Sequence, residues 1–155
     1  MVQSARPRVS DKWARNSYLD ETEKLFLEDI ADEVIGRAFK AAANLDATIC
    51  VSVVDKNGLL CAFRRMADVI PGAIDVAFKK AHTASLFRLD TDEIGKVMHP
   101  DGMAYTLQFT NGGLIGFGGG VVIYDNTAHV IGAVGVSGAT PSIDNQIALS
   151  AAGRK

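Results

Sequence analysis

Two charged residues, Lys80 and Asp144, are the strongest candidates for chemistry in this sequence. Lys80 falls within about a turn of an alanine stripe in a predicted helix, and Asp144 lies in the first turn of the last predicted helix. A partly buried lysine can hold an acid, and a carboxylate can move protons, as can His82 two residues after the lysine. Each charged residue also has a structural explanation. A lysine can extend its amine to solvent, and a carboxylate stabilises a helix N-terminus.

The junction from Ser137 to Pro141 is the second candidate. The preceding run, Val130–Val136, mixes β-branched and small residues, which predicts a buried strand whose backbone something approaches closely. Thr140 is a natural N-cap, and Pro141 fits the first helical position. A strand, a glycine turn and a helix N-terminus leave free N–H groups pointing at one place, which favours an anionic ligand. Ser137 has no evident base, so we expect it to supply a hydrogen bond rather than attack a substrate.

Further binding residues are predicted in two other segments. The triple glycine 118–120 is either a bulge or a place where backbone amides face a ligand and stabilise developing negative charge. Arg65, at the end of a predicted strand, can bind a carboxylate. The predicted ligand-binding residues are Arg65, Gly119, Gly120, Ser137, Gly138 and Thr140.

Composition excludes several classes of function. The chain has 155 residues, a formal net charge of −2 and no basic stripe, so we expect one globular domain that binds neither nucleic acid nor an anionic membrane. The three histidines and two cysteines lack metal-ligand spacing, and no metal site is predicted. No apolar stretch is long enough to span a membrane, and no signal core is visible, which predicts a cytoplasmic protein.

The order of local patterns predicts an α+β protein. Residues 1–17 are basic and polar and show no sustained hydrophobic periodicity. We expect a flexible arm there, before a single domain at 18–155. Hairpin-linked strands favour an antiparallel sheet with helices packed on it. The predicted elements are helices at 27–43, 73–89, 93–98 and 141–152, a hairpin at 48–65, and a second hairpin from 114 to 136.

Several motifs give the sequence a resemblance to the GlcG/HbpS-like proteins, which also form the C-terminal domain of PduO-type cobalamin adenosyltransferases. The resemblance runs from about Leu25 to Ala152. This chain has Ala67-Asp68 where the family commonly has Asp-Gly, and Val122 where it commonly has proline. The motifs that resemble the family are Val53-Val-Asp-Lys-Asn-Gly58, Arg65-Met66, Asp75-x-Ala77-x-x-Lys80-Ala81-x-Thr83-Ala84, Gly119-Gly120, and Gly132-Ala-Val-Gly-Val-Ser-Gly138 with Asp144.

The resemblance implies a five-stranded antiparallel sheet with flanking helices, a profilin-like sandwich, and assembly into dimers or larger rings. Some members of the family bind haem and are linked to its degradation, some bind iron, and others accompany catabolic enzymes. The haem ligand varies among members, and the histidine that some use on the first helix is absent here. His82 is then the first candidate ligand for haem iron, with His99 second.

Three functions follow from these observations. The resemblance favours a protein that binds haem or another tetrapyrrole in a glycine-lined pocket. The residues themselves favour an enzyme, a hydrolase, deaminase or isomerase of a small carboxylated catabolic intermediate, in which Lys80 or Arg65 holds the acid and Asp144 or His82 moves protons. The third hypothesis is a non-catalytic oligomeric accessory protein with the alanine-striped helix as its interface.

Overall fold

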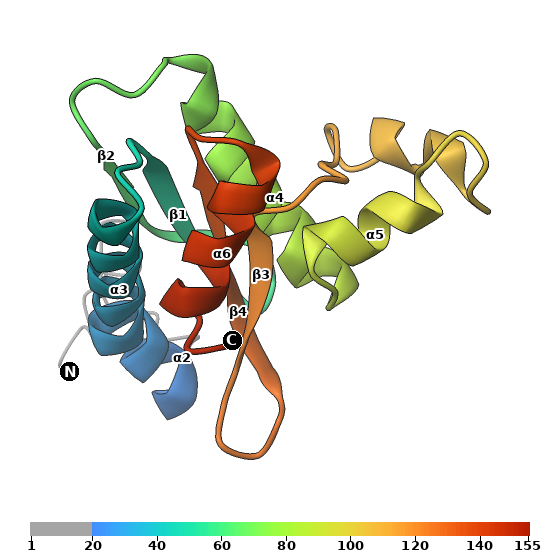
Figure 1. The fold of residues 1–155 in the computed structure, drawn as a ribbon. Coiled ribbons are helices and arrows are strands. Elements are labelled where there is room, and N and C mark those ends of the chain that lie inside the picture. The colour runs from blue at the N-terminus through green and yellow to red at the C-terminus, as the bar shows by residue number, and fades with distance from the viewer. Residues whose placement is uncertain (1–19) are drawn as a thin grey trace, which may run out of the picture.

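The computed structural model describes residues 20–155, and the predicted arm at 1–17 lies outside them. Within this range the chain alternates helices with two β-hairpins (Figure 1). The elements are α2 (Glu21–Leu25), the π-helical turn η1 (Phe26–Ile30), α3 (Ala31–Asn44), β1 (Cys50–Asp55), β2 (Leu60–Arg65), α4 (Gly72–Phe87), α5 (Thr91–Val97), the 3-10 helix η2 (Tyr105–Phe109), β3 (Gly120–Tyr124), β4 (Val130–Ser137) and α6 (Pro141–Ala151).

The strands form an antiparallel sheet in the order β2-β1-β4-β3. Within residues 20–155 the sheet has four strands, which corrects the expectation of five. The segment Leu114–Phe117 precedes β3 without pairing in the sheet, because Leu114 is buried against Ile94 and Met98 of the α5 region. The glycine turn that follows, with Gly119 at φ +121°, then redirects the chain into β3.

Helices cover both faces of the sheet, with α3 and α6 on one face and α4 on the other (Figure 1). The main core lies under α3 and α6 and includes the inward side chains of β1 and β4. On the other face, the alanine stripe of α4 is fully or almost fully buried against the sheet of its own chain. The alanine stripe therefore packs on a sheet, the first of its two expected partners, and is not available as a subunit surface. The stripe consists of Ala73, Ala77, Ala81 and Ala84.

Close approach of α4 to β4 depends on a small residue in the strand. A Cβ atom at Gly135 would collide with the carbonyl oxygen of Ala77. The sequence pattern correctly indicated that something approaches the β4 backbone closely, but the partner is a helix of the protein rather than a ligand.

Side-chain capping marks the start of two of the described helices, α2 and α6. Thr140 caps α6, as predicted, by accepting a hydrogen bond from the Ile143 N–H at 3.3 Å. The first helix starts earlier than predicted because Asp20 and Glu23 form a capping box at its N-terminus. Asp90 precedes α5 but does not cap it, and its carboxylate accepts hydrogen bonds from the Val122 N–H at 3.0 Å and from Arg154 at 2.8 Å.

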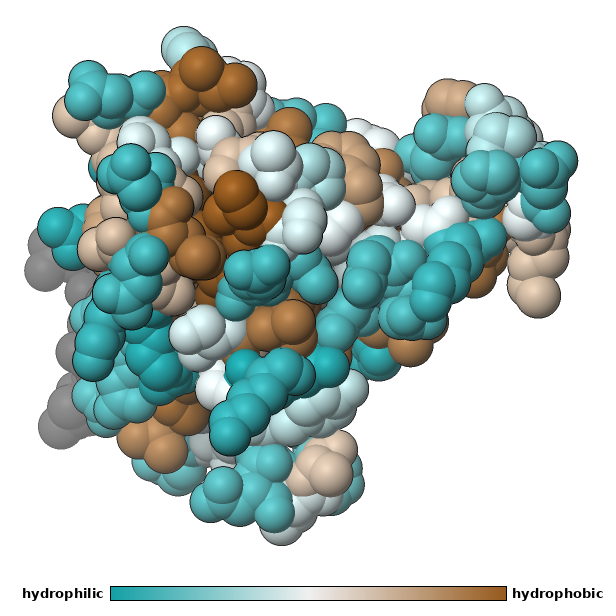
Figure 2. All heavy atoms as spheres, viewed as in Figure 1, coloured by the Kyte–Doolittle hydropathy of each residue, from teal (hydrophilic) through white to brown (hydrophobic). Residues whose placement is uncertain are grey.

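The visible surface is polar over α5 and more apolar between α3 and α6 and at the loop before α4 (Figure 2). None of the helices within residues 20–155 has the length and apolar character that a membrane crossing requires.

Candidate functional site

The predicted pair of charged residues is brought together at the Ser137 end of β4. The Lys80 ammonium, which is fully buried, donates hydrogen bonds to Asp144 Oδ2 at 2.9 Å and to the Val136 carbonyl at 2.8 Å. It also lies 5.0 Å from the centre of the Phe117 ring. Asp144 Oδ1 accepts the Ala139 N–H at 3.0 Å. The pair therefore connects α4, β4 and the first turn of α6 through the protein interior.

Burial governs the electrostatics of this pair. Removal from water lowers the pKa of Lys80, because desolvation penalises the ammonium, and the bond to Asp144 opposes that change. Both bonds of the amine go to protein atoms, so in this structure Lys80 holds Asp144 rather than a substrate. The catalytic roles of Lys80 and Asp144 stay predictions.

The backbone amides expected to face a ligand are already bonded within the protein. The N–H of Gly119 donates to Asn145 Oδ1 at 3.1 Å, and the N–H of Gly120 donates to Thr91 Oγ1 at 2.9 Å. A Cβ atom at Gly119 would lie 2.6 Å from the Lys80 nitrogen. These glycines serve close packing around the charged pair.

The other predicted binding residues lie at the same end of the sheet. Ser137 and Arg65 both pair with Cys50, so the three residues form one row across β4, β1 and β2. Ser137 is buried, whereas Arg65 is exposed. Burial raises the pKa of the Cys50 thiol, and the nearby Arg65 charge opposes this shift. Gly138 adopts φ +141° at the turn that leads to the exposed cap Thr140.

The two histidines proposed as haem ligands lie elsewhere. The His82 Nδ1 atom lies 2.9 Å from the Gly58 carbonyl oxygen, and the His82 ring is stacked on Phe78. His99 is exposed after α5, and its Nδ1 accepts the Asp101 N–H at 3.2 Å. The structure therefore does not bring His82 together with Lys80 and Asp144.

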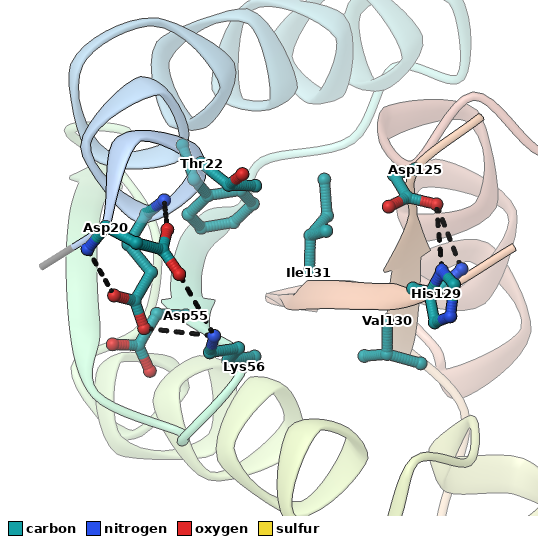
Figure 3. Close-up of a pocket in the computed structure, with 10 residues that line it drawn as sticks. Asp20, Thr22, Asp55, Lys56, Asp125, His129, Val130 and Ile131 are labelled. Atoms are coloured by element: carbon teal, nitrogen blue, oxygen red, sulfur yellow. Dashed lines mark hydrogen bonds and ion pairs between the residues drawn. The ribbon is translucent and has the colours of Figure 1, made fainter. Parts of the chain in front are cut away.

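A cavity of about 320 Å³ opens at the opposite end of β4. Figure 3 shows Asp20, Thr22 and Lys56 on one side, Asp125 and His129 on the other, and Ile131 between them. The cavity forms where the start of the first helix meets the turns of the two hairpins. Its lining residues are Asp20, Thr22, Glu23, Phe26, Asp55, Lys56, Asp125, His129, Val130 and Ile131.

The cavity combines apolar residues with a charged rim. Phe26 is buried, and its ring occupies the space that a side chain at Gly132 would need. On the rim, Lys56 is 3.1 Å from Glu23 Oε1 and 3.9 Å from Asp20 Oδ2. These ion pairs fix the start of the first helix to the β1–β2 turn.

Sequence reasoning missed this cavity because its polar residues looked like ordinary turn residues. The available signal was topological. Asp55, which ends β1, pairs with Gly132 near the start of β4, so antiparallel pairing places the β1–β2 turn beside the start of β4.

The opposite wall of the cavity contains a short hydrogen-bonded chain. Asp125 Oδ1 accepts the hydroxyl of Thr127 at 2.7 Å and the backbone N–H groups of Thr127 at 2.8 Å and His129 at 2.9 Å. Thr127 Oγ1 lies 2.7 Å from His129 Nδ1. These bonds lower the pKa of Asp125, the His129 backbone N–H contributing most. The carboxylate is thus held in its ionised form.

Comparison with known proteins places the chain in a family. A family model described as "Haem degrading protein HbpS-like" matches residues 26–153. The chain belongs to this HbpS-like family. The family match confirms the resemblance drawn from the motifs of the sequence.

The relatives of this HbpS-like chain include proteins of known structure. A 15.0 kDa protein of the dhaT-dhaS intergenic region of Citrobacter freundii is 38% identical over 71% of this chain and 78% of its own. The structure of a PduOC:haem complex has a TM-score of 0.76 and 29% identity, covering 81% of this chain and 91% of that chain. An HbpS double mutant of Streptomyces reticuli has a TM-score of 0.77 and 29% identity, covering 97% of both chains.

Three further cavities of the HbpS-like chain lie away from β4. One of about 490 Å³ lies between α3 and α6 and includes Ser150 in its lining. Two of about 420 and 440 Å³ share His99, Gly95 and Gly116 in their linings. Among residues 20–155, no three His, Cys, Asp or Glu side chains are grouped so that they could hold a metal ion.

Proposed function

We propose that this chain binds haem or a related tetrapyrrole in the cavity at the Val130 end of β4. Membership of the HbpS-like family supports haem binding, as does the similarity to the PduOC:haem complex. The proposal moves the ligand away from the glycine segments of the Ser137 end, whose amides bond to protein side chains.

The observation behind this placement is the combination of cavity and lining. Phe26, Val130 and Ile131 contribute apolar surface, and the volume of about 320 Å³ lies near the lower limit of about 300–1,000 Å³ for small-molecule sites. A site of this size buries part of a flat apolar macrocycle and leaves the rest in solvent. Haem also brings an iron that takes a nitrogen ligand from a protein side chain. His129, on the cavity wall, provides such a nitrogen.

A hemin titration with paired tryptophan variants tests both the ligand and the site. Thr22→Trp fills the proposed cavity from an exposed helical position, whereas Ser150→Trp makes the same kind of change at the cavity between α3 and α6. We expect unmodified protein and Ser150→Trp to shift the Soret band of hemin with equal affinity. Thr22→Trp should weaken binding at least about tenfold. The indole would occupy space in the cavity, and the apolar contacts that hemin then loses with the lining are worth more than about 1 kcal/mol.

The outcomes separate the ligand from its location. If the unmodified protein leaves the Soret band of hemin unchanged, the proposed function is wrong. If hemin binds and Thr22→Trp matches the unmodified protein while Ser150→Trp weakens binding, the ligand is correct and the cavity is not. Circular dichroism of the three proteins confirms that each variant is folded.

The expected self-association also belongs to this proposal. Large apolar side chains are exposed on and beside the edge strand β2, with Leu59 at 61% and Leu60 at 56% exposure. An unpaired strand edge with apolar side chains favours pairing with another copy. Light scattering after size-exclusion chromatography should give a mass above that of one chain, and Leu60→Lys should reduce it.

A further inference from the structure

The three histidines differ in which ring nitrogen has a free lone pair. A neutral imidazole carries its proton on one nitrogen and accepts, or binds a metal, with the other. The hydrogen-bond partner of Nδ1 therefore decides whether Nε2 is ready to bind iron. A carbonyl or hydroxyl that accepts from Nδ1 leaves Nε2 unprotonated, whereas an N–H donor to Nδ1 places the proton on Nε2.

At His129 the partners require a proton on Nδ1. The single hydroxyl proton of Thr127 is directed to Asp125 Oδ1, 2.7 Å away. Thr127 Oγ1 is then an acceptor toward His129 Nδ1, which lies 2.7 Å from it and must donate. Nε2 of His129 is left with a free lone pair.

A haem ligand needs both a free Nε2 and a place at the proposed cavity, and neither of the other two histidines has both. The Asp101 N–H donates to Nδ1 of His99, so the neutral ring has its proton on Nε2 and must rearrange before it can bind iron. His82 donates from Nδ1 to the Gly58 carbonyl and has a free Nε2, but its half-buried ring lines none of the four cavities of about 320 to 490 Å³.

His129 alone of the three combines a free Nε2 with a place at the proposed haem cavity. It is part of the wall with Asp125, Val130 and Ile131, and Figure 3 shows its ring beside Asp125 at the end of β4. Its side chain is 79% exposed, so a ligand reaches the ring without rearrangement of the core. The turn is held by two bonds between these residues: the Asp125 N–H donates to the His129 carbonyl, and the His129 N–H donates to Asp125 Oδ1.

We infer that His129 Nε2 is the protein ligand to the iron of bound haem, and that Thr127 and Asp125 are positioning residues that fix its tautomer. This inference rests on the proposed haem-binding function. A ligating histidine whose other nitrogen donates to a hydroxyl or carboxylate is the usual arrangement at metal sites, since that bond sets the tautomer and raises the basicity of the ligand.

The test compares the hemin complexes of the full chain with those of His129→Ala, His82→Ala and His99→Ala. His129→Ala should lose the histidine-ligated absorption and electron paramagnetic resonance spectra. It should also weaken hemin affinity at least about tenfold, because even residues that only hydrogen-bond to a metal ligand contribute about 10–100-fold to metal affinity. Added imidazole should restore the ligated spectrum. His82→Ala and His99→Ala should retain the spectrum of the unmodified protein.

The role of the positioning residues is tested by the iron–histidine stretching frequency in resonance Raman spectra of the reduced complex. Thr127→Val removes the acceptor of the Nδ1 proton and should lower this frequency, whereas Thr127→Ser keeps the hydroxyl and should restore it. A merely structural role of Thr127 would leave the frequency unchanged.

Failure of the inference is distinguishable from failure of the proposed function. If hemin does not bind, both are wrong. If hemin binds and Thr22→Trp weakens binding, but His129→Ala keeps the histidine-ligated spectrum, the function and cavity stand and the assignment of His129 is wrong. Loss of the histidine-ligated spectrum in His82→Ala or His99→Ala, rather than in His129→Ala, would also show that the assignment of His129 is wrong.

Discussion

The two ends of β4 contain similar kinds of residues with different consequences. At the Ser137 end, Lys80 is bonded to Asp144 and to the Val136 carbonyl. The amides of Gly119 and Gly120 there donate to protein side chains. At the Val130 end, the turns and the first helix enclose about 320 Å³, and His129 presents a free nitrogen beside it. A buried charge with internal partners therefore indicates packing, while a polar group with a free lone pair on a cavity indicates binding.

Removal of the buried Lys80 cation at the Ser137 end of β4 should have the largest effect on stability. Lys80→Met leaves the carboxylate of Asp144 buried without its partner, and we expect the free energy of unfolding to fall by about 3–5 kcal/mol. Urea denaturation followed by circular dichroism measures this change. Lys79→Met is the control, because its pair with Asp75 is partly exposed to solvent and contributes about 0–1 kcal/mol.

A second substitution, at Asp144, tests whether the uncompensated charge causes the loss of stability. Lys80→Met combined with Asp144→Leu removes both charges, and most of the lost stability should return, since the penalty comes from an uncompensated buried charge. A double variant as unstable as Lys80→Met alone would show that the bonds of the pair to Val136 and Ala139 matter more than its charge.

The glycine beside the pair should show the next largest effect. Gly119→Ala introduces a Cβ atom 2.6 Å from the Lys80 nitrogen and 2.7 Å from the Val136 carbonyl oxygen, at φ +121°. We expect a loss of about 2–3 kcal/mol from overpacking and backbone strain. Gly112→Ala also has positive φ but no neighbouring atom within 4 Å, so strain alone should cost about 1 kcal/mol. Equal losses in the two variants would contradict tight packing at Gly119.

The elements of the fold could be predicted wherever a local pattern determines them. The Thr140 cap with Pro141 after it, the β1–β2 turn at Asp55 and the apolar period of the first helix all appear in the structure, because each depends on neighbours in the sequence. The expected fifth strand depended on the family resemblance. Residues 114–117 pack on α5 instead, a tertiary contact that no local pattern records.

The site was harder to predict because its contacts join distant segments. Sequence position placed Lys80 near an apolar stripe but could not reveal that its partner lies 64 residues away and fills its hydrogen bonds. His129 follows a turn and has no distinctive neighbours in the sequence. Its significance depends on two hydrogen bonds, through Thr127 to Asp125, and on the first helix lying opposite.

The smallest expected effect on stability concerns Asp125, at the Val130 end of β4. The pKa of Asp125 is lowered from 3.8 by the N–H of His129 and the hydroxyl of Thr127, so its stabilising contribution is present above 3.8 and is lost as pH falls through the lower folded-state pKa. Asp125→Asn should therefore decrease Tm slightly near neutral pH, and the difference from the unmodified protein should close in acid. Thr127→Val removes one donor to the carboxylate and should move this loss of stability to higher pH. A difference in Tm that stays constant across the acid range would show that ionisation of the Asp125 carboxylate does not stabilise the turn that contains His129.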